Sequence, residues 1–246
     1  MSAIAALVPV RNRVDGKRRL SAEFEPSERR ALIESMAQHV VTTLMRSGVV
    51  SRVMVISKDV DFIDDILPDI AGVALIHQPS SVVGLNAALG LGREWAMVRG
   101  VSRLLVLSGD LPLLTVDDVR ELGRRSSPVV LASDWAGRGT NGLLLNEERL
   151  PRAASGSAAS VNLISDFAFK FGTDSLPKHV EEAARLGAPA EIVLGRGTAH
   201  DLDTPEDWKL LDPAAREWLL PHDPCMERSS TLVRRSCVSV AMMEHS

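Results

Sequence analysis

Basic side chains gather directly after the first apolar run of the chain. Residues 9–20 read Pro-Val-Arg-Asn-Arg-Val-Asp-Gly-Lys-Arg-Arg-Leu, although the chain as a whole carries 28 Lys and Arg against 32 Asp and Glu. Cations neutralise charge that is spread over phosphate oxygens, so this loop suits a polyanion such as a triphosphate. A solvated charged loop is the alternative. The loop contains neither a P-loop nor a dinucleotide-binding fingerprint.

Carboxylates follow two later segments of the chain. Asp110 comes shortly after the apolar run at residues 104–107, and Asp201 and Asp203 alternate on a segment that we expect to be extended. Alternate residues of an extended segment face the same side. Mg²⁺ prefers carboxylate oxygens together with substrate phosphates. We therefore predict that Asp203, Asp201 or both complete a Mg²⁺ site with Asp110; the alternative is that these aspartates only cap their own turns.

Three polar, glycine-containing segments also follow predicted strands. Gly84-Leu85-Asn86 opens a helix, where the Asn86 amide could cap the helix or read the edge of a base. Residues 137–142 form a predicted tight turn that brings backbone amides near a ligand. Residues 171–179 precede a helix, so their amides, Ser175 and Lys178 could hold an anion. His179, at the same helix start, is either a site residue or an ordinary surface histidine.

Apolar periodicity predicts the elements that must position these loops. The predicted strands cover residues 4–10, 53–57, 73–77, 104–107, 129–132, 143–145 and 191–194, and the predicted helices cover residues 27–46, 61–67, 86–98, 117–124, 181–186 and 204–211. This alternation predicts an α/β fold with a mostly parallel, doubly wound sheet, which binds ligands at the carboxyl ends of its strands. Ser27 is the predicted cap of the first helix. Met36, Val40 and Leu44 could serve a homodimer interface, but core packing is favoured.

Length and composition exclude several classes of protein. The chain has 246 residues, of which 45% are hydrophobic and 24% charged, as in an ordinary globular protein. A net charge of −4 argues against a nucleic-acid partner. The chain contains neither a membrane-spanning apolar run nor a signal-peptide pattern, so we expect no membrane partner and a cytoplasmic location. Cys225 and Cys237 offer no disulfide framework.

The domain boundary is predicted from the loss of periodicity. We expect one domain over residues 1–220 and a C-terminal tail over residues 221–246, whose scattered Ser, Arg and Met are typical of a disordered segment. Residues 152–160 are expected to form a mobile loop of small residues.

Several short motifs, taken in order, resemble one known family. They are Lys17-Arg18-Arg19-Leu20-Ser21, Gly84-Leu85-Asn86, Gly109-Asp110-Leu111-Pro112, Gly139-Thr140-Asn141, Phe171-Gly172-Thr173-Asp174-Ser175 with His179, and Asp201-Leu202-Asp203-Thr204-Pro205. Over about residues 4–212 they are similar to the guanylyltransferases of coenzyme F-420 biosynthesis, which act on 2-phospho-L-lactate, phosphoenolpyruvate or 3-phosphoglycerate. Each motif is weak alone, but their shared order and spacing is specific.

The resemblance implies a single Rossmann-like, GT-A-like nucleotidyltransferase domain that joins GTP to a phosphorylated three-carbon acid and releases pyrophosphate. It also implies Mg²⁺ as cofactor and a product that passes to the next enzyme of the pathway. By the same resemblance, the catalytic residues are Lys17, Arg19 and Asp110; the nucleotide-binding residues are Arg11, Lys17, Arg19, Gly84, Asn86 and Asp110; the acid-binding residues are Thr140, Asn141, Gly172, Ser175 and His179; and the metal ligands are Asp110, Asp203 and Asp201.

Three alternatives stay open at this point. Another nucleotidyltransferase of the same fold, of the molybdenum-cofactor or sugar-phosphate type, would need a glycine-rich loop that residues 12–15 do not provide. A glycosyltransferase would use a DxD motif, and residues 201–203 match one by spelling, although late in the chain. A non-catalytic nucleotide-binding protein is disfavoured because Lys17 and Asp110 are both present.

Overall fold

The central feature of the fold is a seven-stranded sheet. The computed structural model describes residues 3–10, 17–67, 71–147, 149–151 and 160–220. The sheet contains β1 (Ile4–Pro9), β2 (Val50–Ser57), β3 (Val73–His77), β4 (Arg103–Leu107), β5 (Val129–Ser133), β6 (Thr140–Asn146) and β9 (Ala190–Val193). Their order is β3-β2-β1-β4-β6-β5-β9, and only β6 runs antiparallel to its neighbours. The predicted mostly parallel α/β fold is confirmed.

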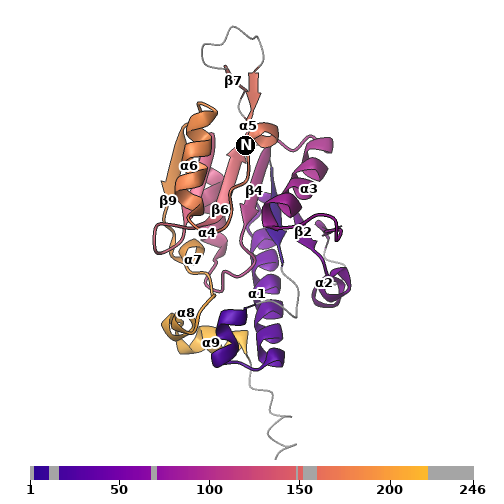
Figure 1. Ribbon diagram of the computed structural model, residues 1–246, viewed down its shortest axis with the longest axis vertical. Helices are drawn as coiled ribbons and strands as arrows, with labels where there is room; N and C mark the ends of the chain where they lie inside the picture. The colour runs from indigo at the N-terminus through magenta and orange to yellow at the C-terminus, as the bar shows by residue number, and fades with distance from the viewer. Residues whose placement is uncertain (1–2, 11–16, 68–70, 148, 152–159, 221–246) are drawn as a thin grey trace, which may run out of the picture.

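Helices cover both faces of this sheet (Figure 1). One face carries α1 (Pro26–Arg46), α2 (Val60–Ile66) and α4 (Val116–Arg124), and the other carries α3 (Leu85–Val98), α5 (Leu163–Asp166) and α6 (Ser175–Arg185). Side chains alternate between the faces along each strand. In β1, Ala6 and Val8 face the α1 layer, whereas Ala5 and Leu7 face the α3 layer. The buried runs of the strands therefore serve two cores at once.

The winding direction reverses between β1 and β4. The chain passes from β1 to β2 and β3 on one side, and α3 then returns it to β4 on the other side of β1. Ligands of doubly wound sheets bind at this kind of switch point, beyond the carboxyl ends of the strands. Gly109 follows β4 there, and a Cβ added to it would lie 3.0 Å from the carbonyl oxygen of Pro9. A side chain at this position would make a tight contact, so glycine favours the close approach of the ends of β1 and β4.

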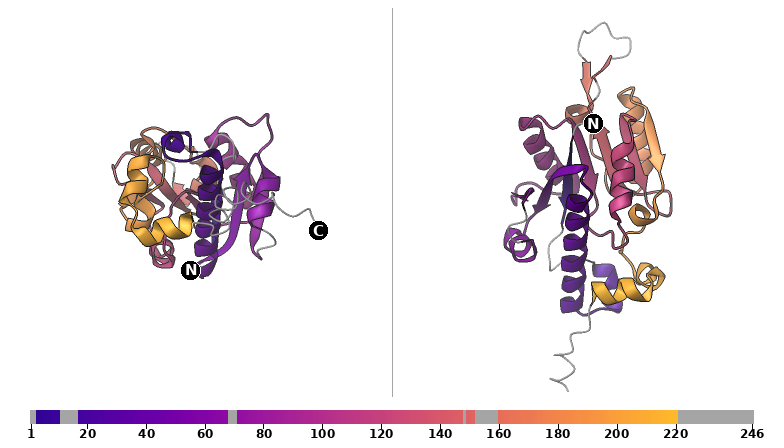
Figure 2. Two further views of the ribbon diagram at one scale, coloured as in Figure 1. Left: turned by 90° about the horizontal axis from the view of Figure 1, so that it is seen from below. Right: turned by 180° about the vertical axis from the view of Figure 1, so that it is seen from behind.

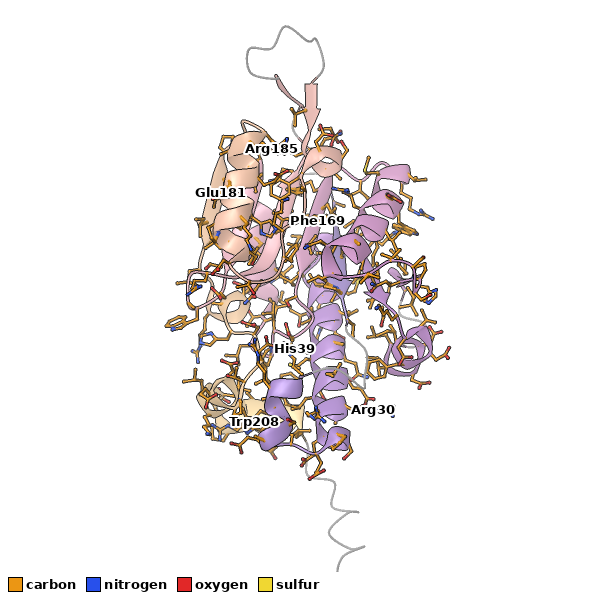
Figure 3. All side chains as sticks on the ribbon, in the orientation of Figure 1. Arg30, His39, Phe169, Glu181, Arg185 and Trp208 are labelled. Atoms are coloured by element: carbon orange, nitrogen blue, oxygen red, sulfur yellow. The ribbon has the colours of Figure 1, made fainter. Side chains whose placement is uncertain are left out.

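A small lobe extends the molecule at one end of α1. It consists of the 3₁₀ helix η1 (Arg18–Ala22), the first half of α1, α8 (Pro205–Leu210) and α9 (Pro213–Leu219). Both views of Figure 2 and the labelled Trp208 in Figure 3 show these segments together. Their buried side chains form a separate apolar cluster of Leu20, Leu32, Met36, Leu202, Leu211, Ala215 and Leu219. This cluster fixes η1 and the segment before α8 against α1.

The structure corrects several local predictions. The cap of α1 is Glu25, which forms a capping box with Glu28, so Ser27 does not cap the helix. Residues 140–142 belong to β6 rather than to a turn, and α6 begins at Ser175, six residues before the predicted start. Periodicity missed η1, α5, α7 (Arg196–Ala199), α9 and the small antiparallel pair of β7 (Arg149–Pro151) with β8 (Ser160–Asn162). These elements are short, so they span too few residues to show a period.

Other predictions are confirmed or lie outside the described residues. Met36, Val40 and Leu44 are buried in the cores, as the favoured alternative required. Residues 152–159 of the loop predicted at 152–160 lie outside the described residues, and Ser160 begins β8. The predicted tail at 221–246, both cysteines and Arg11 also lie outside the described residues. No helix in the described part of the chain has both the length and the apolarity to cross a membrane.

Candidate functional site

A cleft of about 950 Å³ opens at the carboxyl ends of the strands. Lys17, Arg19 and Asp110 line one part of the cleft, and residues 134–136, 138–140 and 171–175 line a second part, which we call the Thr140 wall. Asn141 lies beside Ser108, whose backbone N–H donates to the Asn141 carbonyl at 2.8 Å. Asp201 and Asp203 also line the cleft. In the chain they lie just before α8 (Pro205–Leu210). Of the predicted site residues, the cleft lining thus contains Lys17, Arg19, Asp110, Thr140, Asn141, Gly172, Ser175, Asp201 and Asp203.

The Lys17 ammonium joins two of the predicted metal ligands. Its Nζ atom lies 2.5 Å from Asp110 Oδ2 and 2.6 Å from Asp203 Oδ1. The Lys17 side chain is only 8% exposed, whereas the Asp203 side chain is 48% exposed. Lys17 precedes η1 in the left-handed backbone conformation, with φ of 57°. Among the described non-glycine residues, only Asp174 also has a positive φ, and it too lines the cleft. Backbone strain of this kind clusters at functional sites.

In this cluster the carboxylates outnumber the positive charges, and burial shifts the pKa values of the groups. Burial lowers the pKa of the Lys17 ammonium, but Asp110 and Asp203 outweigh burial and raise it above the ordinary value. Burial raises the pKa of Asp110, but Lys17 and a hydrogen bond from Ser108 at 2.6 Å outweigh burial and lower it. Burial and the charge of Asp110 raise the pKa of Asp201 to about 6. One ammonium therefore does not compensate three carboxylates.

The carboxylates fit a hard divalent cation by their chemistry. All the candidate ligands are oxygens, which Mg²⁺ prefers, and the pKa of Asp201 is raised by burial and by the neighbouring negative charge of Asp110. The Asn141 amide donates to Asp201 Oδ1 at 3.2 Å and orients that carboxylate. In the part of the chain that the structure describes, no three His, Cys, Asp or Glu side chains already surround one point. Lys17 stands between Asp110 and Asp203 instead.

A chain of buried hydrogen bonds supports the Thr140 wall. The backbone N–H of Thr140 donates to Ser175 Oγ at 2.8 Å, which leaves the Ser175 proton free to donate into the cleft. His179 Nε2 accepts from the backbone N–H of Lys170 at 2.9 Å, so Nδ1 carries the proton and donates to Thr140 Oγ1 at 2.9 Å. His179 is fully buried and lies behind Thr140 rather than in the cleft lining. The structure therefore makes His179 a positioning residue for Thr140.

The neutral state of His179 predicts a pH-dependent stability. Burial lowers its pKa to about 4, against about 6.5 in the unfolded chain. Between these values the unfolded state binds more protons, so the free energy of unfolding falls as the pH drops from about 6.5 to about 4. The expected loss from this residue is on the order of 3 kcal/mol. Urea unfolding at several pH values checks it: the wild-type curve must fall more steeply than that of His179→Asn, and parallel curves would contradict the assignment.

Asn86 and Gly84 occupy the start of α3, but Asn86 is already engaged. Its Nδ2 donates to the carbonyl of Phe171 at 3.0 Å, and its Oδ1 accepts from the N–H of Phe171 at 2.9 Å. Asn86 thus neither caps α3, which Gly84 does, nor offers a free amide edge to a base. It ties α3 to the loop that contains Gly172. A direct contact of Gly84 or Asn86 with the nucleotide stays a prediction.

The segment before this loop is held between two helices. Figure 3 shows Phe169 between α3 and α6. The Arg93 guanidinium of α3 lies 5.1 Å from the Phe169 ring centre and donates to the carbonyl of Phe167 at 2.8 Å. From α6, Glu182 Oε1 accepts from the backbone N–H of Ala168 at 2.8 Å. Residues 171–175 are therefore presented to the cleft from a rigid support.

Sequence reasoning gave no role to five cleft residues, Ser108, Trp135, Arg138, Asp174 and His200. Ser108 hydrogen-bonds Asp110, Arg138 pairs with Asp174, and the Trp135 ring lies 5.0 Å from the ring of His200 at the edge of the cleft. The available signal for Trp135 was a large aromatic residue in a predicted loop of a chain with 4% aromatics. Arg138 stood inside the glycine-containing segment already singled out at 137–142, but only its backbone was considered.

The doubly wound sheet and the charged cleft at its switch point define an α/β domain with the nucleotidyltransferase fold. A nucleotidyl transferase from Methanothermobacter shares this fold with a TM-score of 0.62 at 16% identity, over 91% of this chain and 100% of that one. At this level of identity the likeness concerns the fold alone.

Sequence comparison then identifies the family. Residues 4–211 match the family described as "Guanylyl transferase CofC like", and the chain belongs to this family. A phosphoenolpyruvate guanylyltransferase of Sphaerobacter thermophilus is 33% identical, with 82% of this chain and 89% of the relative covered. A 3-phospho-D-glycerate guanylyltransferase of Phenylobacterium zucineum is 32% identical, with 82% and 86% covered. The protein is accordingly an enzyme of the nucleotidyltransferase class.

Proposed function

We propose that this enzyme transfers GMP from GTP to the phosphate of a three-carbon acid and releases pyrophosphate. The observation that carries the proposal is that one cleft is lined by both the Lys17 cluster and the Thr140 wall with Ser175. The activities named for the relatives make phosphoenolpyruvate and 3-phospho-D-glycerate the first acceptors to test, followed by 2-phospho-L-lactate. We place the reaction in coenzyme F-420 biosynthesis in the cytoplasm, with the product passing to the next enzyme.

The chemistry requires alignment and charge neutralisation more than covalent catalysis. A phosphate oxygen of the acid attacks the α-phosphorus of GTP, a new P–O bond forms, and the bond to the β-phosphate oxygen breaks. The attacking phosphate is already an anion at neutral pH, so the step needs no general base. We assign Lys17 and Arg19 to the phosphates of GTP, because cations stabilise the charge that develops on departing pyrophosphate.

We assign Asp110, Asp203 and Asp201 to Mg²⁺. When bound, the ion would neutralise the two phosphate groups that must approach each other. Asp110 follows β4 and Asp203 precedes α8, so the edge of the sheet and the small lobe each contribute a ligand. Asn141 orients the third carboxylate through its hydrogen bond to Asp201. Lys17 keeps Asp110 and Asp203 together at one end of the cleft.

Pyrophosphate release tests the proposal. The enzyme is incubated with GTP, Mg²⁺ and each of the three acids in parallel, with the next enzyme of the pathway added because the product could be unstable. Release with one acid supports the proposal and identifies the acceptor. If none of the three acids gives pyrophosphate release, but CTP or a sugar phosphate does, the proposal is overturned in favour of another nucleotidyltransferase activity on the same fold.

Ser175→Ala is expected to weaken the acid more than GTP. The variant loses the free hydroxyl proton and leaves the buried N–H of Thr140 without its acceptor. Losing such a hydrogen bond costs about 1–3 kcal/mol, and about 1.4 kcal/mol is a factor of ten, so the KM for the acid should rise about 5- to 150-fold, with the KM for GTP changed about twofold at most. Ser165→Ala, a hydroxyl on α5 outside the cleft lining, is the matched control. Equal losses for both substrates would contradict the placement of Ser175.

A further inference from the structure

The described lining of the cleft has more negative than positive side chains. Its aspartates are Asp110, Asp134, Asp174, Asp201, Asp203 and Asp207, whereas its Lys and Arg residues are Lys17, Arg19 and Arg138. Both proposed substrates are anions, so each available cation in this cleft matters for binding. Lys17 is already bound to two carboxylates, and Arg19 belongs to the same 3₁₀ segment. Arg138 comes from a different segment, the turn between β5 and β6, and belongs to the Thr140 wall.

Arg138 is built into the wall that carries Thr140 and Ser175. It lies two residues before Thr140 in the turn between β5 and β6. Its carbonyl accepts the backbone N–H of Leu176, in the first turn of α6, at 2.9 Å. Its guanidinium donates from Nε at 2.8 Å and from Nη2 at 2.6 Å to a single oxygen, Oδ1 of Asp174. The backbone of Arg138 is thus held by α6, and its side chain is held by Asp174.

Most of the donors of this guanidinium are still available. An arginine has five N–H donors, and Asp174 takes two of those of Arg138. Nη1 has no hydrogen-bond partner among the residues that the structure describes, and the Arg138 side chain, which lines the cleft, is 70% exposed. Planar guanidinium groups match carboxylates through paired hydrogen bonds. The group is therefore fixed in position and able to bind an anion.

We propose that Arg138 binds the carboxylate of the acceptor acid and that Asp174 holds the guanidinium in place and moderates its attraction for that acid. The inference rests on the proposed function. The phosphate of the acceptor must face the α-phosphorus of GTP at the Lys17 end of the cleft, so its carboxylate is directed toward another part of the wall. Among the described residues that line the cleft, Arg138 is the cation nearest in the chain to Thr140, whereas Lys178, which donates to the carbonyl of Thr173, is not part of the lining. It acts as a specificity residue for acceptors with a carboxylate.

Two substitutions in the same ion pair separate this role from a structural one. Arg138→Gln is expected to raise the KM for the acid about tenfold or more and to change the KM for GTP about twofold at most, because charge-assisted hydrogen bonds to the acid are lost. Asp174→Asn is expected to leave the KM for the acid unchanged or lower it, because it removes a competing negative charge. Asparagine tolerates the left-handed conformation of position 174, so the backbone is preserved.

The remaining variants complete the test. Arg138→Lys keeps the charge without the planar fork, and we expect a KM for the acid between those of the wild type and Arg138→Gln. Arg124→Gln removes an exposed arginine that is paired with Glu121 on α4, outside the cleft, and should behave as the wild type. All variants are assayed as the full chain by pyrophosphate release with GTP, Mg²⁺ and the acid that the wild type accepts.

The outcomes distinguish the two proposals. If Arg138→Gln and Asp174→Asn raise the KM for the acid equally, the pair only holds the loop and the role of Arg138 is overturned. If Arg138→Gln behaves as Arg124→Gln, the carboxylate binds elsewhere and the role is again overturned. If the wild type releases pyrophosphate with none of the acids, the proposed function fails, and the acceptor role of Arg138 fails with it.

Discussion

Asp110→Asn is expected to lower guanylyl transfer by about 10³-fold or more while the protein still folds. Asp110 lies at the carboxyl end of β4, where its two oxygens contact Lys17 and Ser108. Asparagine has the same shape, so the packing of Gly109 against Pro9 is preserved. Asparagine lacks the negative charge that holds Lys17 in place and that we propose as a ligand of Mg²⁺. Losing one preorganised electrostatic contact in an active site commonly costs 10²–10³-fold, and this substitution removes more than one.

The measurement for Asp110→Asn is pyrophosphate release under saturating GTP and acid, together with thermal unfolding as a check on folding. Asp117→Asn is the matched control, because Asp117 is 88% exposed on α4 and pairs with Arg120 at the surface. The control should retain wild-type turnover. Turnover of Asp110→Asn above about a tenth of the wild-type rate would remove Asp110 from the catalytic machinery.

Lys17→Met is expected to lower kcat/KM by about 10²–10³-fold and to destabilise the protein in the absence of Mg²⁺. The substitution leaves Asp110 and Asp203 facing each other without the ammonium between them. Removing one partner from a fully buried ion pair costs about 3–5 kcal/mol, but Asp203 is about half exposed, so we expect roughly 1–3 kcal/mol. We expect the loss of turnover because Lys17, whose side chain is only 8% exposed, is a cation that we assign to the phosphates of GTP.

Mg²⁺ gives this second prediction a readout that does not depend on turnover. If Asp110 and Asp203 bind the ion, adding Mg²⁺ should raise the unfolding temperature of Lys17→Met more than that of the wild type, because the variant has no competing ammonium. Lys209→Met is the control, since Lys209 is an exposed lysine outside the cleft lining. Equal Mg²⁺ shifts in all three proteins would argue against a metal site between these carboxylates.

Local periodicity was sufficient for most of the fold. The strand at residues 73–77 has the predicted bounds, and the other main strands and helices were located within a few residues except α6, because burial on a sheet or helix face repeats along the chain. The antiparallel insertion of β6 between β4 and β5 could not be predicted in this way. A strand has the same apolar pattern whichever way its neighbours run, so strand order and direction depend on the connections and on the packing of the whole sheet.

The candidate site was predicted unevenly for the same reason. Thr204, with Pro205 after it, was recognised as a helix start, and the structure shows a capping box there with Asp207. Caps involve residues three apart, so the local sequence contains them. His179 and Asn86 were recognised as important but given the wrong surroundings. Their partners, Thr140 and Phe171, lie 39 and 85 positions away in the chain.

The sequence by itself determined which chemical groups this protein can use. The order of its motifs indicates the family, and the placement of Lys17, Asp110 and Asp203 after predicted strands or before a helix indicates a polyanion and metal site. Only the tertiary structure decided that one ammonium bridges Asp110 and Asp203 and that Asp201 lacks a compensating charge. The physical reason is that residue type and spacing set secondary structure locally, whereas pKa values and hydrogen-bond partners depend on burial and distance through space.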